Sequence, residues 1–182
     1  MRWSSVWQPL VCALVMVSAS PVRCEELTIE QAYATIHPQR AVFDPGLAGM
    51  APEESAYLAA FFDLIDLAVK ERVETLLWLQ SKGTQGEGID EYDALLARFA
   101  ALRAPGRLRR IHQWVITAVT QQRDVLREWR ADPTRLSMRH PLVGSSSSLL
   151  HQTYGEVIRL YPGEDQRNRQ AFYDYFCSLD FL

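Results

Sequence analysis

Two short segments of the sequence each combine a histidine with an arginine, a pair of side chains that can hold a carboxylate or a phosphate. The four residues are His37, Arg40, Arg139 and His140. Arginine binds such anions through two parallel hydrogen bonds, and a protonated histidine adds a further donor. If the two segments meet in the fold, these side chains would form an anion site. The alternative is that all four residues belong to solvated turns.

The local motifs of common catalytic and metal centres are missing from the sequence. Its four histidines form no H-E-x-x-H, E-x-x-H or C-x-x-C-H pattern, so neither a di-iron centre nor covalent haem is predicted. No serine stands in the G-x-S-x-G context of a hydrolase. Catalytic triads also assemble from residues distant in the sequence, so these motifs do not exclude an enzyme. We expect a non-catalytic protein with no cofactor and no bound metal.

Polar residues on the helix predicted over 107–130 need partners. Arg107, Arg109 and Arg110 crowd the start of this helix, where the positive end of the dipole disfavours cations. Their partners could be the acidic residues within 90–93 or an external anion, and the alternative is a solvated surface. His112 borders the apolar stripe of the helix, and we expect it to be a hydrogen-bonded core or boundary residue rather than a ligand.

Large apolar side chains are concentrated between residues 172 and 182. One buried helix face accommodates about half of them, and the remainder would form an apolar patch of the kind that anchors a protein partner. The predicted partner patch consists of Phe172, Phe176, Phe181 and Leu182. The alternative is that this tail closes the protein core and is held there by a disulfide between Cys24 and Cys177.

Residues 1–19 have the order of charge, apolar core and small residues that is typical of a secretory signal peptide. Arg2 precedes an apolar run from Leu10 to Val17, which small residues follow. A run of about eight residues is too short to span a bilayer, which takes roughly twenty. We expect cleavage after Ala19, no stable membrane span afterwards, and an exported protein that is periplasmic or secreted.

The composition indicates one ordinary globular domain, which we assign to residues 20–182. The chain has 182 residues, of which 48 % are hydrophobic and 23 % are charged. Its formal net charge of −3 becomes −4 when the signal peptide removes Arg2. A nucleic-acid partner is not expected, because it would require a strongly basic surface. The expected partner is another protein in the cell envelope or outside the cell.

The elements that position these residues are predicted to be helices, because apolar residues recur at helical spacing and no alternating run indicates a strand. The fold class is an all-α, single-domain bundle of about five to six helices. The expected helices cover 28–36, 52–82, 90–103, 107–130, 149–161 and 164–180. Irregular loops over 37–52 and 131–145 carry the histidine–arginine pairs. One of the serines within 145–148 is expected to cap the helix that follows.

The sequence therefore favours an exported, non-catalytic helical protein that binds another macromolecule, as an assembly factor, an inhibitor or an envelope adaptor. The alternative is a helical bundle that binds a small ligand, with an anion site between the 37–52 and 131–145 loops.

The mature protein should contain residues 20–182 with one disulfide bond. Cys12 leaves with the signal peptide, and an oxidising compartment favours a bridge between the two remaining cysteines, Cys24 and Cys177. The intact mass of the non-reduced exported protein should be two hydrogen atoms below that of the corresponding dithiol. Two thiols that are freely alkylated under native conditions would contradict the bridge, and an intact Met1 in the exported fraction would contradict the cleavage.

Overall fold

The computed structural model describes residues 31, 34, 40–80, 88–135, 137 and 139–180, and this part of the chain contains helices and no strand. Its α-helices are α2 (Pro52–Gln80), α3 (Gly88–Ala101), α4 (Arg109–Ala131), α5 (Pro141–Leu160) and α6 (Gln166–Leu179). Short 3-10 helices cover Pro45–Leu47, Gly106–Leu108 and Pro133–Arg135. The predicted all-α bundle is confirmed. Most of the helix expected over 28–36 lies outside the described residues.

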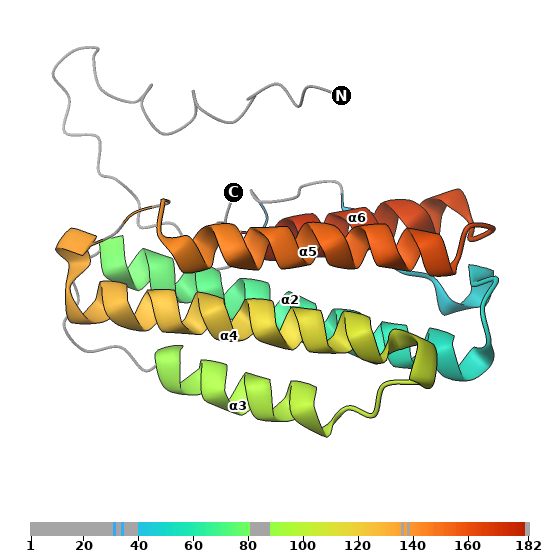
Figure 1. The fold of residues 1–182 in the computed structure, drawn as a ribbon, viewed down its shortest axis with the longest axis horizontal. Coiled ribbons are helices and arrows are strands. Elements are labelled where there is room, and N and C mark those ends of the chain that lie inside the picture. Colours follow the sequence, from blue (N-terminus) through green and yellow to red (C-terminus); the bar gives the residue numbers. More distant parts are fainter. Residues whose placement is uncertain are drawn as a thin grey trace, which may run out of the picture.

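The five described helices lie along one common axis, and successive helices run in opposite directions (Figure 1). Helices α2 and α4 form the centre, since α2 contacts α3, α4 and α6, while α4 contacts α2, α3 and α5. Helix α3 covers one side of this central pair, and α5 and α6 cover the other (Figure 1). Within the described part of the chain, no helix is both long and apolar enough to cross a membrane.

The core is aromatic where α2 faces α6. The ring of Phe62 on α2 stacks on that of Tyr175 on α6, with the ring centroids 4.2 Å apart. Phe172 and Phe176 also contact Phe62, and they are only 0 % and 2 % exposed. The prediction that these two residues belong to an exposed partner patch is therefore wrong, because their helix face is turned towards α2. Phe181 and Leu182 lie outside the described residues.

Residues 40–51 form a strap that runs along α6 in the opposite direction. Three polar side chains of the α6 segment bind its backbone N–H groups: Asp174 accepts from Ala41 at 2.7 Å, Asn168 from Asp44 at 2.8 Å, and Glu164 from Gly49 at 3.0 Å. Phe43 of the strap packs its ring against both Phe62 and Phe172. The strap is thus fixed by backbone hydrogen bonds along its length and by one buried aromatic anchor.

Helix α5 begins at Pro141, well before the predicted start at 149. Proline suits the first turn of a helix, and the His140 side chain caps it by accepting the N–H of Leu142 at 3.2 Å. The predicted irregular segment 131–145 therefore ends earlier than expected. The sequence pattern concealed this start because a run of small polar residues, 145–148, resembles a linker.

The serines of that run lie inside the helix rather than at its cap. Ser146 is buried and donates to the carbonyl of Ala118 on α4 at 3.3 Å. Ser147 is also buried and donates to Asp180 Oδ2 at 2.7 Å. Because these hydroxyl groups are satisfied by neighbouring helices, they are compatible with a helix interior that faces the core.

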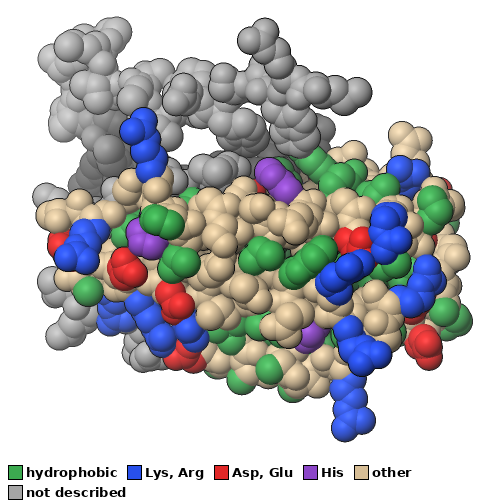
Figure 2. Space-filling model, viewed as in Figure 1, with side chains coloured by type: hydrophobic (Ala, Val, Ile, Leu, Met, Phe, Trp, Pro, Cys, Tyr) green, Lys and Arg blue, Asp and Glu red, His purple; other side chains and the backbone are tan. Residues whose placement is uncertain are grey.

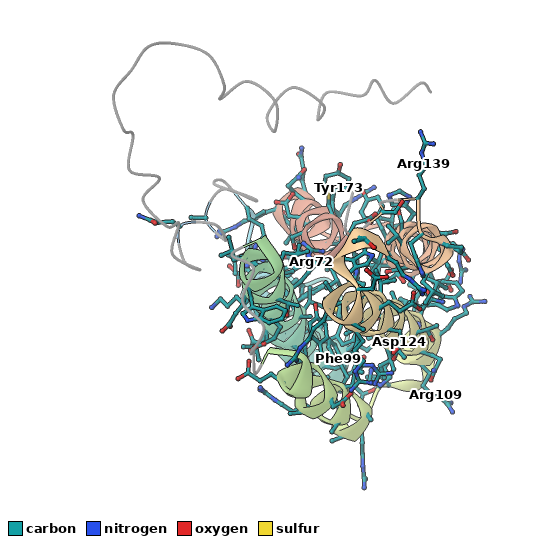
Figure 3. All side chains as sticks on the ribbon, turned by 90° about the vertical axis from the view of Figure 1, so that its left-hand side faces the viewer. Arg72, Phe99, Arg109, Asp124, Arg139 and Tyr173 are labelled. Atoms are coloured by element: carbon teal, nitrogen blue, oxygen red, sulfur yellow. The ribbon has the colours of Figure 1, made fainter. Side chains whose placement is uncertain are left out.

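A buried arginine of α2 closes the C-terminal end of α6. Arg72 is 5 % exposed and lies inside the bundle (Figure 3). Its guanidinium donates to the carbonyl oxygens of Leu179 at 2.6 Å, Asp180 at 2.7 Å and Ser178 at 2.6 Å. The last carbonyls of a helix lack partners within the helix, and its C-terminal end carries partial negative charge. The Arg72 guanidinium therefore donates hydrogen bonds to these carbonyls and places a positive charge at the negative end of the helix.

Replacing Arg72 by methionine should lower the free energy of unfolding by about 3 kcal/mol, because buried carbonyl groups lose their donors while the volume is nearly kept. The matched control is Arg98→Met, which removes an exposed arginine from α3. Urea denaturation of both variants measures the difference. Equal unfolding midpoints for the two variants would show that Arg72 does not stabilise the end of α6.

Candidate functional site

An apolar groove of about 540 Å³ lies between α5 and α6. Its lining residues are Leu150, His151, Tyr154, Tyr173, Phe176 and Cys177. On each helix, the lining residues lie within about one turn of one another, at 150, 151 and 154 on α5 and at 173, 176 and 177 on α6. This spacing places them on one face of each helix. Tyr173 stands on the side of the bundle opposite α3 (Figure 3). The volume lies within the range of roughly 300–1,000 Å³ that is typical of ligand-binding clefts.

Aromatic and polar groups share the rim of this groove. The rings of Tyr154 and Tyr173 meet edge to face across it, with the centroids 5.5 Å apart. The His151 side chain is 69 % exposed, and its Nε2 lies 3.6 Å from Asp180 Oδ2. Tyrosine provides a large apolar ring with a polar tip, which makes it a common anchor at binding surfaces.

The thiol in the groove is not an activated nucleophile. Cys177 is half-buried, and burial raises the pKa of its thiol, with the nearby carboxylates of Asp180 and Asp174 acting in the same direction against a lowering contact from Tyr173. A cysteine attacks as a thiolate, so a raised pKa reduces its reactivity at neutral pH. Although His151 and Asp180 are near, the arrangement favours binding over cysteine chemistry.

The predicted partner of Cys177, Cys24, lies outside the described residues, so the disulfide stays a prediction. At the described end of the strap, Ala41 binds Asp174, which precedes Cys177 by three residues on α6. At about 3.3 Å per extended residue, the segment between Cys24 and Ala41 is long enough to reach the groove.

Arg40, predicted to bind an anionic ligand, has an internal anion as its partner. Both of its terminal nitrogens contact the carboxylate of Asp66 on α2, with Nη2 donating to Oδ2 at 2.6 Å. The guanidinium also lies over the ring of Tyr175, 4.5 Å from the centroid. A bidentate ion pair and an aromatic face give this half-buried arginine a structural role between the strap, α2 and α6.

The other residues of the predicted anion site lie elsewhere. His140 caps α5, and its Nε2 is 3.1 Å from a carboxylate oxygen of Glu128 on α4. Arg139 is exposed and points away from the bundle (Figure 3). His37 lies outside the described residues, so an anion site formed by all four stays a prediction. Arg40 pairs with Asp66 on α2, whereas His140 pairs with Glu128 on α4. The two residues therefore bind carboxylates of different helices.

The arginines at the start of α4 contact acidic residues other than those predicted. Arg107 lies 3.7 Å from Glu54, and Arg110 forms an ion pair with Glu156. Figure 2 shows basic side chains gathered at this end of the bundle. Within the predicted acidic segment, Asp93 instead pairs with Arg123 and Arg127, at 2.9 and 2.5 Å.

His112 has the structural role that was expected for it. Its Nδ1 is 2.8 Å from the hydroxyl oxygen of Tyr57, and the ring lies among Tyr57 and Phe61 at the boundary of the core. Burial lowers the pKa of His112, which favours the neutral ring. A neutral, hydrogen-bonded imidazole between α2 and α4 is explained by packing alone.

Three carboxylates converge where α2 approaches the start of α3. Glu71, Glu74 and Glu91 each offer an oxygen, and these oxygens lie within 4.8 Å of one another. Burial, a side-chain hydrogen bond with Glu91 and the charges of Glu91 and Glu74 together raise the pKa of Glu71 to about 8. Such a group can share a proton or attract a cation, but an acidic cluster alone does not establish a metal site.

In comparisons with known proteins, no family model, curated protein or solved structure matches this chain.

Sequence reasoning missed the groove because apolar periodicity marks every residue that faces inward and does not show where two helices leave a gap. Helical spacing within 149–161 places both Leu150 and Tyr154 on the inward face, but Leu150 is fully buried while Tyr154 is only half-buried. The groove is recognised only from the way α5 packs against α6.

The stability of the protein should fall as pH rises from about 5 to above 8, and Glu71→Gln should weaken this dependence. In that window the folded state keeps a proton on Glu71, whose pKa is about 8, while the unfolded chain has released it. Because only the unfolded chain releases this proton in that window, rising pH favours unfolding until the folded carboxyl itself ionises near pH 8. Urea midpoints across pH measure the slope, and Asp63→Asn, which removes an exposed carboxylate from α2, is the control. An unchanged slope in Glu71→Gln would contradict the assignment.

Proposed function

We propose that this protein is exported and acts without catalysis, by binding another protein of the cell envelope or the cell exterior through the α5–α6 groove. The observation that carries the proposal is the groove itself: an apolar cleft with aromatic walls. We propose that the partner presents an apolar, aromatic-rich segment, because a lining of this kind offers contact area and few charges.

The side chains of the groove have the properties of interface anchors. Tyr154 and Tyr173 are half-buried, so part of each ring remains available for contact. Phe176 is buried behind them and supports the floor. Residues with large, rigid rings dominate the energetics of protein interfaces, and their removal often costs about 2 kcal/mol or more. Both walls are helices, which hold these rings in place before binding.

A small ligand is the second candidate, and the volume of the groove favours it. About 540 Å³ would accommodate a compact organic molecule. Because the lining is mostly apolar, the ligand would also be apolar. The anion site predicted between the 37–52 and 131–145 loops would use different residues and a different part of the fold.

Photo-crosslinking in the native host tests the proposal. A photoreactive amino acid replaces Tyr154 in the groove, and the matched control carries it at Gln152, an exposed position of the same helix. The expected result is one discrete protein adduct from position 154 and none from 152. Tyr173→Ala should reduce capture of that partner about tenfold, equivalent to roughly 1.4 kcal/mol.

Three other outcomes would contradict a protein partner. Equal adducts from both positions would show that contact is not specific to the groove. An adduct to the N-terminal peptide of the same chain would show that the protein covers its own groove. An apolar compound that co-purifies with the protein, and is lost in Tyr173→Ala, would establish the small-ligand function instead.

A further inference from the structure

A second pocket, of about 470 Å³, opens at the end of the bundle where the strap, the start of α2 and the α5–α6 turn meet. Its polar lining consists of Glu54, Arg107, Tyr161 and Glu164. Backbone and apolar groups from 49–51 and 160–163 complete the wall. None of these residues lines the α5–α6 groove, so the pocket is a separate feature of the fold.

Glu54 is a buried carboxylate with little compensation. It is 5 % exposed, and among the described residues its ionic contact is with Arg107, at 3.7 Å between Nη1 and Oε2. The Arg107 side chain is itself 57 % exposed and is shared with the carbonyl of Leu160, which accepts from Nη2 at 3.0 Å. Buried charges are normally paired and hydrogen-bonded at close range, so Glu54 retains capacity for another cationic donor.

Tyr161 adds an unsatisfied hydroxyl group to the same pocket. The residue is 6 % exposed, and its hydroxyl has no hydrogen-bond partner among the described residues. Burial raises the pKa of Tyr161, and a side-chain contact with Glu54 and the charge of that carboxylate act in the same direction, so the two groups lie next to each other in the pocket. A buried hydroxyl group without a partner is costly, so it marks a position where a ligand can supply the missing contact.

Glu164 fixes the opposite wall. Its carboxylate accepts the N–H of Gly49 at 3.0 Å and the side-chain amide of Asn168 at 2.9 Å, so it holds the strap and the turn together. It also contributes a second negative charge. With two carboxylates and one guanidinium, the lining carries a formal charge of −1.

We propose that this pocket binds an organic cation, an alkylammonium or a guanidinium group, through the Glu54 carboxylate and the Tyr161 hydroxyl. The negative lining disfavours anions, and an ammonium or guanidinium group supplies the donors that Glu54 and Tyr161 lack. The ring of Tyr161 already accepts a cation, since the Arg107 guanidinium lies 5.3 Å from its centroid. The cation belongs either to a free amine or to a lysine or arginine side chain of a peptide.

Calorimetric titration of the full mature protein tests the proposal with four probes of similar size: n-butylammonium, n-butylguanidinium, n-butanol and butyrate. The expected result is saturable binding of the two cations, at least about tenfold tighter than the neutral and anionic probes. A lysine capped at both ends then identifies the source. Tighter binding of capped lysine than of n-butylammonium indicates a peptide, and the reverse order indicates a free amine.

Paired variants connect the binding to the pocket. Glu54→Gln should weaken cation binding at least about tenfold, while Glu53→Gln, an exposed charge in the same helical turn, should leave it within about twofold. Tyr161→Phe removes only the unpartnered hydroxyl, so it should fold normally and still weaken binding. This variant decides the question if Glu54→Gln does not fold. Unchanged binding in a folded Glu54→Gln or Tyr161→Phe variant, or equal binding of butyrate, would overturn the proposal.

Discussion

The fold depends on the buried guanidinium of Arg72 at the C-terminal end of α6. A charge with 5 % exposure is tolerated only when hydrogen-bond acceptors surround it, and the last carbonyls of a helix are a dense source of acceptors. Three of them bind Arg72, and the carbonyl of Leu179 also accepts from Gln122 on α4 at 2.6 Å. Because this network joins α2, α4 and the end of α6, it fixes where the last helix stops and how it is rotated.

The rotation of α6 assigns different tasks to its two sides. One side presents Asp174 and Asn168 to the backbone of the strap, and Glu164 in the turn before α6 binds the same segment, which holds residues 40–51 along the helix. The other side places Tyr173 and Cys177 against α5 and forms the groove. The pocket at the end of the bundle is lined by the strap, the start of α2 and the α5–α6 turn, so it shares no lining residue with the groove.

The two concave sites differ in their chemistry. The groove is apolar, with a tyrosine ring on each of its walls. The pocket is polar, with two buried carboxylates and one buried hydroxyl group in its lining. We propose that the groove binds an apolar segment and that the pocket binds a cation, so that one protein recognises two different chemical groups.

Apolar periodicity by itself determined the all-α class, the course of α2, α3, α4 and α6, and the packing of His112, because these properties depend on residues three or four positions apart. Only the tertiary structure decided that α5 begins at Pro141, since its buried serines are satisfied by Ala118 and Asp180 on other elements. It also decided that Phe172 and Phe176 are core residues and that Glu54 and Tyr161 line one pocket. Glu54 and Tyr161 are far apart in the chain, so a local pattern carries no information about the contacts that give them their environment.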